Sequence, residues 1–234
     1  VFQSFALFPQ RTALDNAAFG LEVAGMPRRQ RIEKAHDALE RVGLGNDLHR
    51  KPSQLSGGMR QRVGLARALA LDPPVLLMDE AFSALDPLIR RDMQDLLLDL
   101  QREHRRTIVF VSHDLDEAVR IGDRIALMQE GRLLQCGHAA ELLLHPRETA
   151  VTSFFSGLDK TTVLRVEAIA EPAPDDLVFS PDGSDQPLLQ GSTLLREAVS
   201  TVASAGAPVP VVNDQQQVIG VVTPQGLLHA IGNQ

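Results

Sequence analysis

Two short stretches of the sequence carry residues that could bind phosphate and a hard cation. Ser56 is followed by Gly57 and Gly58 where a helix is expected to begin, with Ser56 as its N-cap. The free backbone N–H groups of a helix start bind anions, and glycine lets the backbone approach a phosphate closely. Asp79 and Glu80 stand together directly after a short apolar run. Carboxylates at a strand end can hold Mg²⁺ and orient a water, so both stretches predict phosphate chemistry.

The elements that must position these residues follow from hydrophobic spacing and from breaker residues. Helices are expected over residues 12–25, 28–42, 56–70, 115–121, 193–205 and 225–231, and one more begins at Asp86-Pro87. Strands are expected over residues 75–78, 107–111, 124–128, 133–135, 209–212 and 218–222. The first two of these strands are expected to be buried, as parallel strands usually are. Alternating strands and helices predict an α/β domain with a largely parallel sheet.

Single residues indicate where several of these elements begin, turn or end. Thr12 is an expected N-cap, and Gly43 is a suitable C-terminal stop for the helix before it. Glu130-Gly131 predicts a hairpin turn. Pro210 cannot donate to a ladder and marks its strand as an edge strand.

Composition and charge narrow the class of protein. The chain is 44% apolar and 23% charged, which predicts a folded core, and it has no apolar run long enough to span a membrane. Cys136 is its single cysteine, so an internal disulfide is excluded. Of the net charge of −7, a balance of −6 lies in residues 161–234. Nucleic acid is therefore an unsuitable partner for this tail. We find no Cys/His metal spacing and no nucleophilic triad.

The context of the two stretches resembles the signature motif and the Walker B strand of ABC-type ATPases. The residues that carry the resemblance are Leu55-Ser56-Gly57-Gly58-Met59-Arg60-Gln61-Arg62 and Val75-Leu76-Leu77-Met78-Asp79-Glu80. The resemblance covers residues 1 to about 158. It implies a P-loop-NTPase-type (RecA-like) α/β nucleotide-binding domain with a helical subdomain, which uses ATP and Mg²⁺.

The resemblance also implies roles for single residues. Asp79 would help to hold Mg²⁺ through water, and Glu80 would polarise the attacking water. His113 resembles the switch histidine that senses the γ-phosphate, and Asp86 belongs to a D-loop that crosses the dimer interface. Gln3 resembles the Q-loop glutamine, a Mg²⁺ ligand that couples the site to membrane subunits.

The signature residues would act in a different subunit from the one that holds the ATP. The resemblance implies that Ser56, Gly57, Gly58 and Gln61 contact ATP bound by the opposite subunit, in a head-to-tail dimer. Residues 1–9, 78–90 and 116–124 narrow the likeness to ATP-binding subunits of glycine betaine/proline and choline importers. This implies ATP-driven import of a quaternary-amine osmoprotectant through transmembrane permease subunits, with a substrate-binding protein as an indirect partner. The location implied is peripheral, on the cytoplasmic face of the inner membrane.

Residues 159–234 form the second expected domain, a small α+β unit. The helix-strand-strand-helix order at about 190–234 resembles a single CBS motif, which fits a regulatory tail in this subfamily. Where many nucleotide-binding versions carry aspartate, the sequence reads Thr223-Pro224-Gln225-Gly226. We therefore expect a packing or dimerising role for this tail rather than nucleotide binding.

The sequence departs from the family pattern in its phosphate loop. No Gly-x-x-x-x-Gly-Lys-Ser/Thr motif occurs in the 234 residues. The expectation is that the natural protein extends N-terminally and that this chain alone is inactive. The alternatives are an inert fragment in isolation and a soluble ABC ATPase of translation or DNA repair.

Overall fold

The computed structural model describes residue 1, residues 6–173 and residues 187–232. The chain divides into two compact units, Val1–Gly122 and Asp123–Gln234. This division lies inside the segment 1–158 that the sequence assigns to the ATPase domain, and the boundary near residue 158 stays a prediction. No helix in the described ranges is long and apolar enough to cross a membrane.

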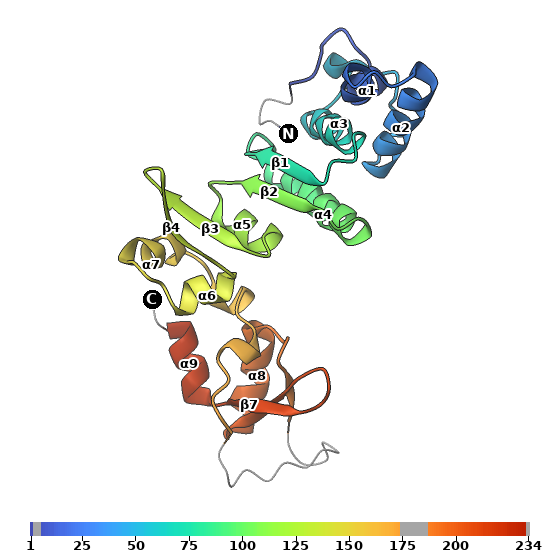
Figure 1. Cartoon of the computed structure of the whole chain (residues 1–234). Coiled ribbons are helices and arrows are strands. Elements are labelled where there is room, and N and C mark those ends of the chain that lie inside the picture. Colours follow the sequence, from blue (N-terminus) through green and yellow to red (C-terminus); the bar gives the residue numbers. More distant parts are fainter. Residues whose placement is uncertain (2–5, 174–186, 233–234) are drawn as a thin grey trace. The chain divides into compact units, whose positions relative to one another are not determined.

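Three helices of the first unit pack against one another: α1 (Ala13–Val23), α2 (Arg28–Arg41) and α3 (Gly57–Leu69) (Figure 1). A short 3₁₀ turn, η1 (Pro52–Gln54), leads into α3. Ala13 and Ala17 on the inner face of α1 are fully buried. Their small side chains let the neighbouring helices approach α1 closely. The expected caps are confirmed: Thr12 forms a capping box with Asp15.

The sheet of this unit consists of two parallel strands joined by a long helix. β1 (Val75–Asp79) pairs with β2 (Thr107–Val111), and α4 (Pro87–Glu103) connects them. α5 (Leu115–Ile121) follows β2 with the predicted bounds. Inward residues of β1, such as Met78, share one core with Met93 and Leu97 of α4. The predicted parallel pairing is therefore confirmed.

The expected burial of these two strands is wrong for one of their faces. Val75 and Leu77 are 46% and 64% exposed, and Val109 and Val111 are 49% and 51% exposed. Alternate residues of a strand point to opposite faces. Because the register sets Leu77 beside Val109, these side chains form one uncovered apolar face. The core of helices and α4 covers only the other face.

The second unit begins with an antiparallel hairpin. β3 (Ile125–Gln129) and β4 (Arg132–Gly137) are joined by Glu130 and Gly131, both with positive φ, as the predicted turn requires. Two short helices follow, α6 (Ala139–Leu144) and α7 (Thr149–Phe155), and then two 3₁₀ turns, η2 (Lys160–Thr162) and η3 (Val166–Ala168).

A three-stranded sheet with two helices completes this unit. The strands are β5 (Leu189–Gln190), β6 (Val209–Val212) and β7 (Val218–Val222), and the helices are α8 (Leu195–Ala205) and α9 (Pro224–Gly232). The predicted helix-strand-strand-helix order is present, and its assignment as a CBS-like motif stays a prediction.

The prediction that Pro210 marks an edge strand is wrong. β6 is the central strand, with β5 on one side and β7 on the other. Proline is tolerated there because β5 is only two residues long and pairs with Val211 and Val212. Pro210 lies beyond the end of β5, so that side of the strand has no ladder to interrupt.

Removing the Thr12 cap should loosen the helical part of the first unit. Thr12 Oγ1 accepts a hydrogen bond from the Asp15 backbone N–H at 3.1 Å. We expect Thr12→Ala to lower the free energy of unfolding by about 1 kcal/mol, measured by urea denaturation. Thr12→Ser keeps the hydroxyl and is the control. Equal stability of the alanine and serine variants would contradict the assignment of the cap.

Candidate functional site

The ends of β1 and β2 bring Glu80 and His113 together. The two strands run parallel and in register, with Asp79 opposite Val111, so the residues that follow them meet at one edge of the sheet. The Glu80 backbone N–H donates to the Val111 carbonyl at 3.0 Å. His113 Nδ1 lies 3.4 Å from Glu80 Oε1. The Glu80 side chain is 35% exposed and that of His113 is 69% exposed, so both are open to a ligand.

Asp79 is exposed at the last position of β1. Its backbone N–H donates to the Val1 carbonyl at 3.0 Å, and the Val1 amine donates to the Leu77 carbonyl at 2.7 Å. Val1 therefore lies along the edge of β1 opposite β2. Gln3, the predicted Mg²⁺ ligand, lies outside the described residues. Ala6, beyond it, is held by Arg67 of α3 through a 2.6 Å hydrogen bond to its carbonyl.

The loop from Glu80 to Asp86 is fixed by its own backbone and by an aromatic anchor. The Ser83 hydroxyl donates to the Glu80 carbonyl at 2.9 Å. Phe82 is fully buried, and its ring centre lies 5.4 Å from that of Phe110 on β2. Asp86 Oδ1 accepts from the Ile89 backbone N–H at 3.1 Å and so caps α4. The structure gives Asp86 a capping role, and its predicted place in a dimer interface stays a prediction.

The two signature glycines differ in what surrounds them. Ser56 caps α3 as predicted, since its Oγ accepts from the Met59 backbone N–H at 3.3 Å. A Cβ added at Gly57 would meet nothing nearer than Arg60 Nη2, at 4.0 Å. A Cβ added at Gly58 would lie 2.5 Å from Ile89 Cγ2. Gly58 therefore lets the start of α3 pack against the start of α4, while Gly57 leaves the helix start open.

Gln61 does not lie where the sequence predicts it. Its side chain is fully buried, and neither amide atom has a hydrogen-bond partner in the described part of the chain. It sits on the inner side of α3, one turn beyond the glycines. A side chain in this position cannot touch a nucleotide, so we correct the predicted contact of Gln61 with ATP. The signature spacing alone does not show which side of the helix a residue faces.

Sequence reasoning missed a buried polar chain behind His113. Gln94 of α4 donates to Glu117 of α5 at 3.1 Å, and both side chains are almost fully buried. The other carboxylate oxygen of Glu117 accepts from the Ser112 hydroxyl at 2.6 Å. Because Ser112 precedes His113, this chain fixes the backbone that carries the histidine. The sequence contained one indication of this chain: Gln94 and Glu117 are polar residues on the apolar faces of their helices.

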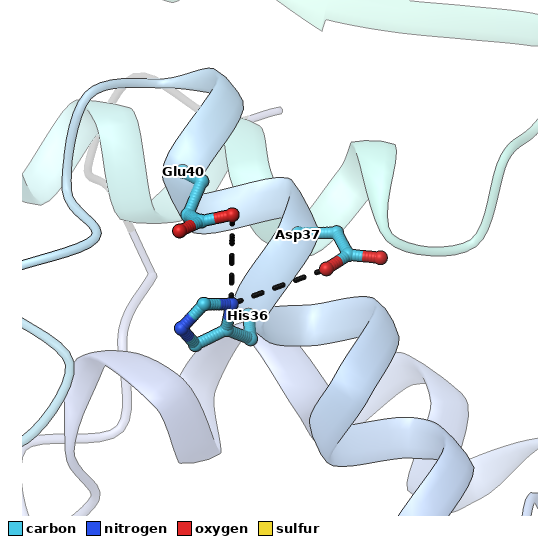
Figure 2. Close-up of side chains that lie close together, drawn as sticks. All are labelled: His36, Asp37 and Glu40. Atoms are coloured by element: carbon cyan, nitrogen blue, oxygen red, sulfur yellow. Dashed lines mark ion pairs between the residues drawn. The ribbon is translucent and has the colours of Figure 1, made fainter.

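A separate cluster lies on the surface of α2. His36 Nδ1 is 3.7 Å from Glu40 and 3.9 Å from Asp37, as Figure 2 shows. The three side chains are 40–62% exposed and come from a single helix. Residues four apart on a helix are neighbours, so an ordinary surface pair between His36 and Glu40 accounts for the arrangement.

Known proteins resemble this chain both in sequence and in fold. A family model described as ABC transporter matches residues 1–83. A dimeric structure of a bacterial ABC transporter cassette is similar, with a TM-score of 0.52 and 37% identity over 59% of this chain and 61% of that one. A second structure of that cassette, in a post-hydrolysis state, is bound to ADP and Pi. The first part of the fold prediction is confirmed: the α/β fold is that of an ABC nucleotide-binding cassette.

Relatives at higher identity place the chain more narrowly. It is 45% identical to the glycine betaine/proline betaine transport system ATP-binding protein ProV of Escherichia coli (strain K12), over all of this chain and 71% of that protein. It is 57% identical over 164 residues to the glycine betaine transport ATP-binding protein OpuAA of Bacillus subtilis (strain 168), which covers 70% of this chain and 39% of that protein. The chain belongs to the family of ABC transporter ATP-binding proteins of glycine betaine/proline transport.

Gly58→Ala should destabilise the first unit by overpacking against Ile89. We expect a loss of about 1–3 kcal/mol in the free energy of unfolding. Ile89→Ala removes the clashing methyl, so the double variant should be less destabilised than the sum of the two single variants. Gly57→Ala is the matched control and should leave stability nearly unchanged. A loss at Gly57 as large as that at Gly58 would contradict the packing role.

Proposed function

We propose that this chain is part of the ATP-hydrolysing subunit of an importer for a quaternary-amine osmoprotectant of the glycine betaine, proline and choline class. The proposal of ATP hydrolysis rests on the pairing of Glu80 with His113 at the ends of two parallel strands. The cargo class rests on the relatives, whose names specify glycine betaine and proline betaine.

The proposed site assigns different roles to the Glu80 carboxylate and the His113 imidazole. Glu80 is placed to orient and polarise a water, because its carboxylate is half-exposed beside His113. In its imidazolium form, His113 can donate one N–H to a phosphate oxygen and the other to the Glu80 carboxylate. Little covalent chemistry is needed in phosphoryl transfer, so positioning and charge stabilisation supply the catalysis.

The donor set at the end of β1 fits a magnesium-bound phosphate. Asp79 is an exposed carboxylate at the carboxyl end of a parallel strand, and oxygen is the ligand that Mg²⁺ prefers. Asp79 would hold the ion through water, and Gln3 remains a predicted further ligand. Bound Mg²⁺ would neutralise charge on the phosphates. The open N-terminus of α3 at Ser56 and Gly57 suits a phosphate presented by a second subunit.

No phosphate-loop motif occurs in these 234 residues, and the proposal is that another segment supplies it. The uncovered apolar face of β1 and β2, with Leu77 64% exposed, supports a further segment packed against it, because parallel sheets are usually covered on both faces.

The proposed assembly has two cassettes and a permease. A second copy would pair head to tail, with Ser56 and Gly57 of each copy facing the nucleotide of the other. The dimeric solved cassette supports this arrangement. Transmembrane permease subunits, with a substrate-binding protein beyond them, would place the protein at the cytoplasmic face of the inner membrane. The tail from residue 159 would serve as a regulatory, dimerising segment.

Replacing Glu80 by glutamine should stop turnover while leaving nucleotide binding intact. In the full-length product of this reading frame, we expect Glu80→Gln to lower the rate of ATP hydrolysis by on the order of 100-fold or more. Binding of ATP, measured by equilibrium dialysis, should stay within a few-fold. Glu103→Gln removes an exposed carboxylate at the far end of α4 and is the matched control. Unchanged hydrolysis in Glu80→Gln would remove Glu80 from its role.

Hydrolysis should depend on residues beyond these 234. We expect the full-length product to hydrolyse ATP and the 234-residue chain to show no hydrolysis above that of its Glu80→Gln variant. Both proteins are assayed side by side with MgATP. Activity of the short chain that Glu80→Gln abolishes would show that the phosphates are held by residues already described.

A further inference from the structure

One guanidinium group lies behind the site and touches two of its loops. Arg90 is on the first turns of α4 and is 27% exposed. Its Nη2 donates to the carbonyls of Ser83 and Leu85, each at 3.2 Å. Its Nη1 donates to Asp114 Oδ2 at 3.1 Å. The same side chain therefore joins the loop after Glu80 to the loop that carries His113.

Each contact of Arg90 leads by one more step to a residue of the site. Ser83 donates to the Glu80 carbonyl from both its hydroxyl and its backbone N–H, at 2.9 and 3.2 Å. Asp114 is bonded covalently to His113. Asp114 is also fixed on its far side, because its Oδ1 accepts from the Glu117 backbone N–H at 3.1 Å. Arg90 thus acts on Glu80 through Ser83 and on His113 through Asp114.

The chemistry of arginine suits this bridging position. A guanidinium is planar and presents its donors in a fixed fork, whereas an ammonium is a point charge on a flexible stem. Such a fork can hold two carbonyls of one loop and a carboxylate of another at the same time. The carboxylate contact is charge-assisted and partly shielded from solvent, since Asp114 is 34% exposed.

We propose that Arg90 is a positioning residue for ATP hydrolysis, which sets the distance between the Glu80 carboxylate and the His113 imidazole without touching nucleotide. This inference rests on the proposed function. Two other contacts keep α4 and α5 together when Arg90 is changed: Gln94 with Glu117, and Asp95 with Arg120. The loss of Arg90 should therefore affect the site more than the fold.

The test compares four variants of the full-length product: Arg90→Gln, Asp114→Asn, their combination, and Arg91→Gln. Asparagine at 114 can still cap α5, so that change removes mainly the carboxylate that faces Arg90. Arg91 is an exposed neighbour on the same helix and carries the same charge, which makes it the matched control. The readouts are kcat and KM for ATP and the midpoint of thermal unfolding.

We expect Arg90→Gln and Asp114→Asn each to lower kcat by on the order of 10- to 100-fold, the size of effect that small misplacements of reacting groups produce. KM should change by less than about threefold, and the unfolding midpoint should stay close to that of the parent. Because both residues act through one contact, the double variant should be no slower than the slower single variant by more than about twofold. Arg91→Gln should match the parent.

Three outcomes would overturn the inference. They are a kcat of Arg90→Gln equal to that of Arg91→Gln, a loss of kcat that follows a lowered unfolding midpoint or a raised KM, and full additivity in the double variant. A parent protein that hydrolyses no ATP would instead refute the proposed function, and the inference would fall with it. The parent is measured first, so the two failures are distinguishable.

Discussion

The parallel register of β1 and β2 is the constraint on which the site depends. Val75 lies opposite Thr107 and Asp79 opposite Val111, so the two strands end at the same level. The residues that follow are then forced into contact, and the Glu80 N–H continues the ladder by bonding the Val111 carbonyl. A slip of the register would carry Glu80 past the histidine segment, since each residue advances a strand by about 3.3 Å.

α4 carries much of what surrounds that pair. Its N-cap is Asp86, its first turn presents Ile89 to Gly58 of α3, and Arg90 lies beside Ile89. Further along, Met93 is fully buried in the core and Gln94 reaches Glu117. Successive side chains of α4 thus contact α3, the loop after β1, the hydrophobic core and the residues on either side of His113. This explains how residues distant in sequence come to share one geometry.

The features that the sequence predicted correctly are mostly local ones. The caps at Thr12, Ser56 and Asp86 depend on a side chain and a backbone N–H a few residues away, and the turn at Glu130-Gly131 depends on two φ angles. Such features are set by neighbours in the chain, whereas the roles of Asp79, Glu80 and His113 rest on motif spacing and stay predictions. The contact between Glu80 and His113 follows from the parallel pairing of β1 and β2, which the sequence also predicts.

The predictions that failed depend on distant neighbours. The exposure of Leu77 depends on which face of the sheet has a cover, and the tolerance of Pro210 depends on where β5 ends. The burial of Gln61 depends on which side of α3 meets the core. Arg90 was missed for the same reason, because its partners are carbonyls and a carboxylate on separate loops. None of these properties is encoded in the spacing of residue types.

The backbone conformation of Glu80 affects which substitutions at this position would stabilise the protein. Glu80 has φ of 43°, in the left-handed region that glycine and asparagine occupy more readily than glutamate. Substitution by either residue would relieve backbone strain of about 1 kcal/mol or more while removing the carboxylate. If Glu80 has the proposed role, a selection that rewards only thermal resistance would enrich inactive versions at this position. A glutamate in an unfavourable backbone conformation would then be a stability–activity trade-off at this position.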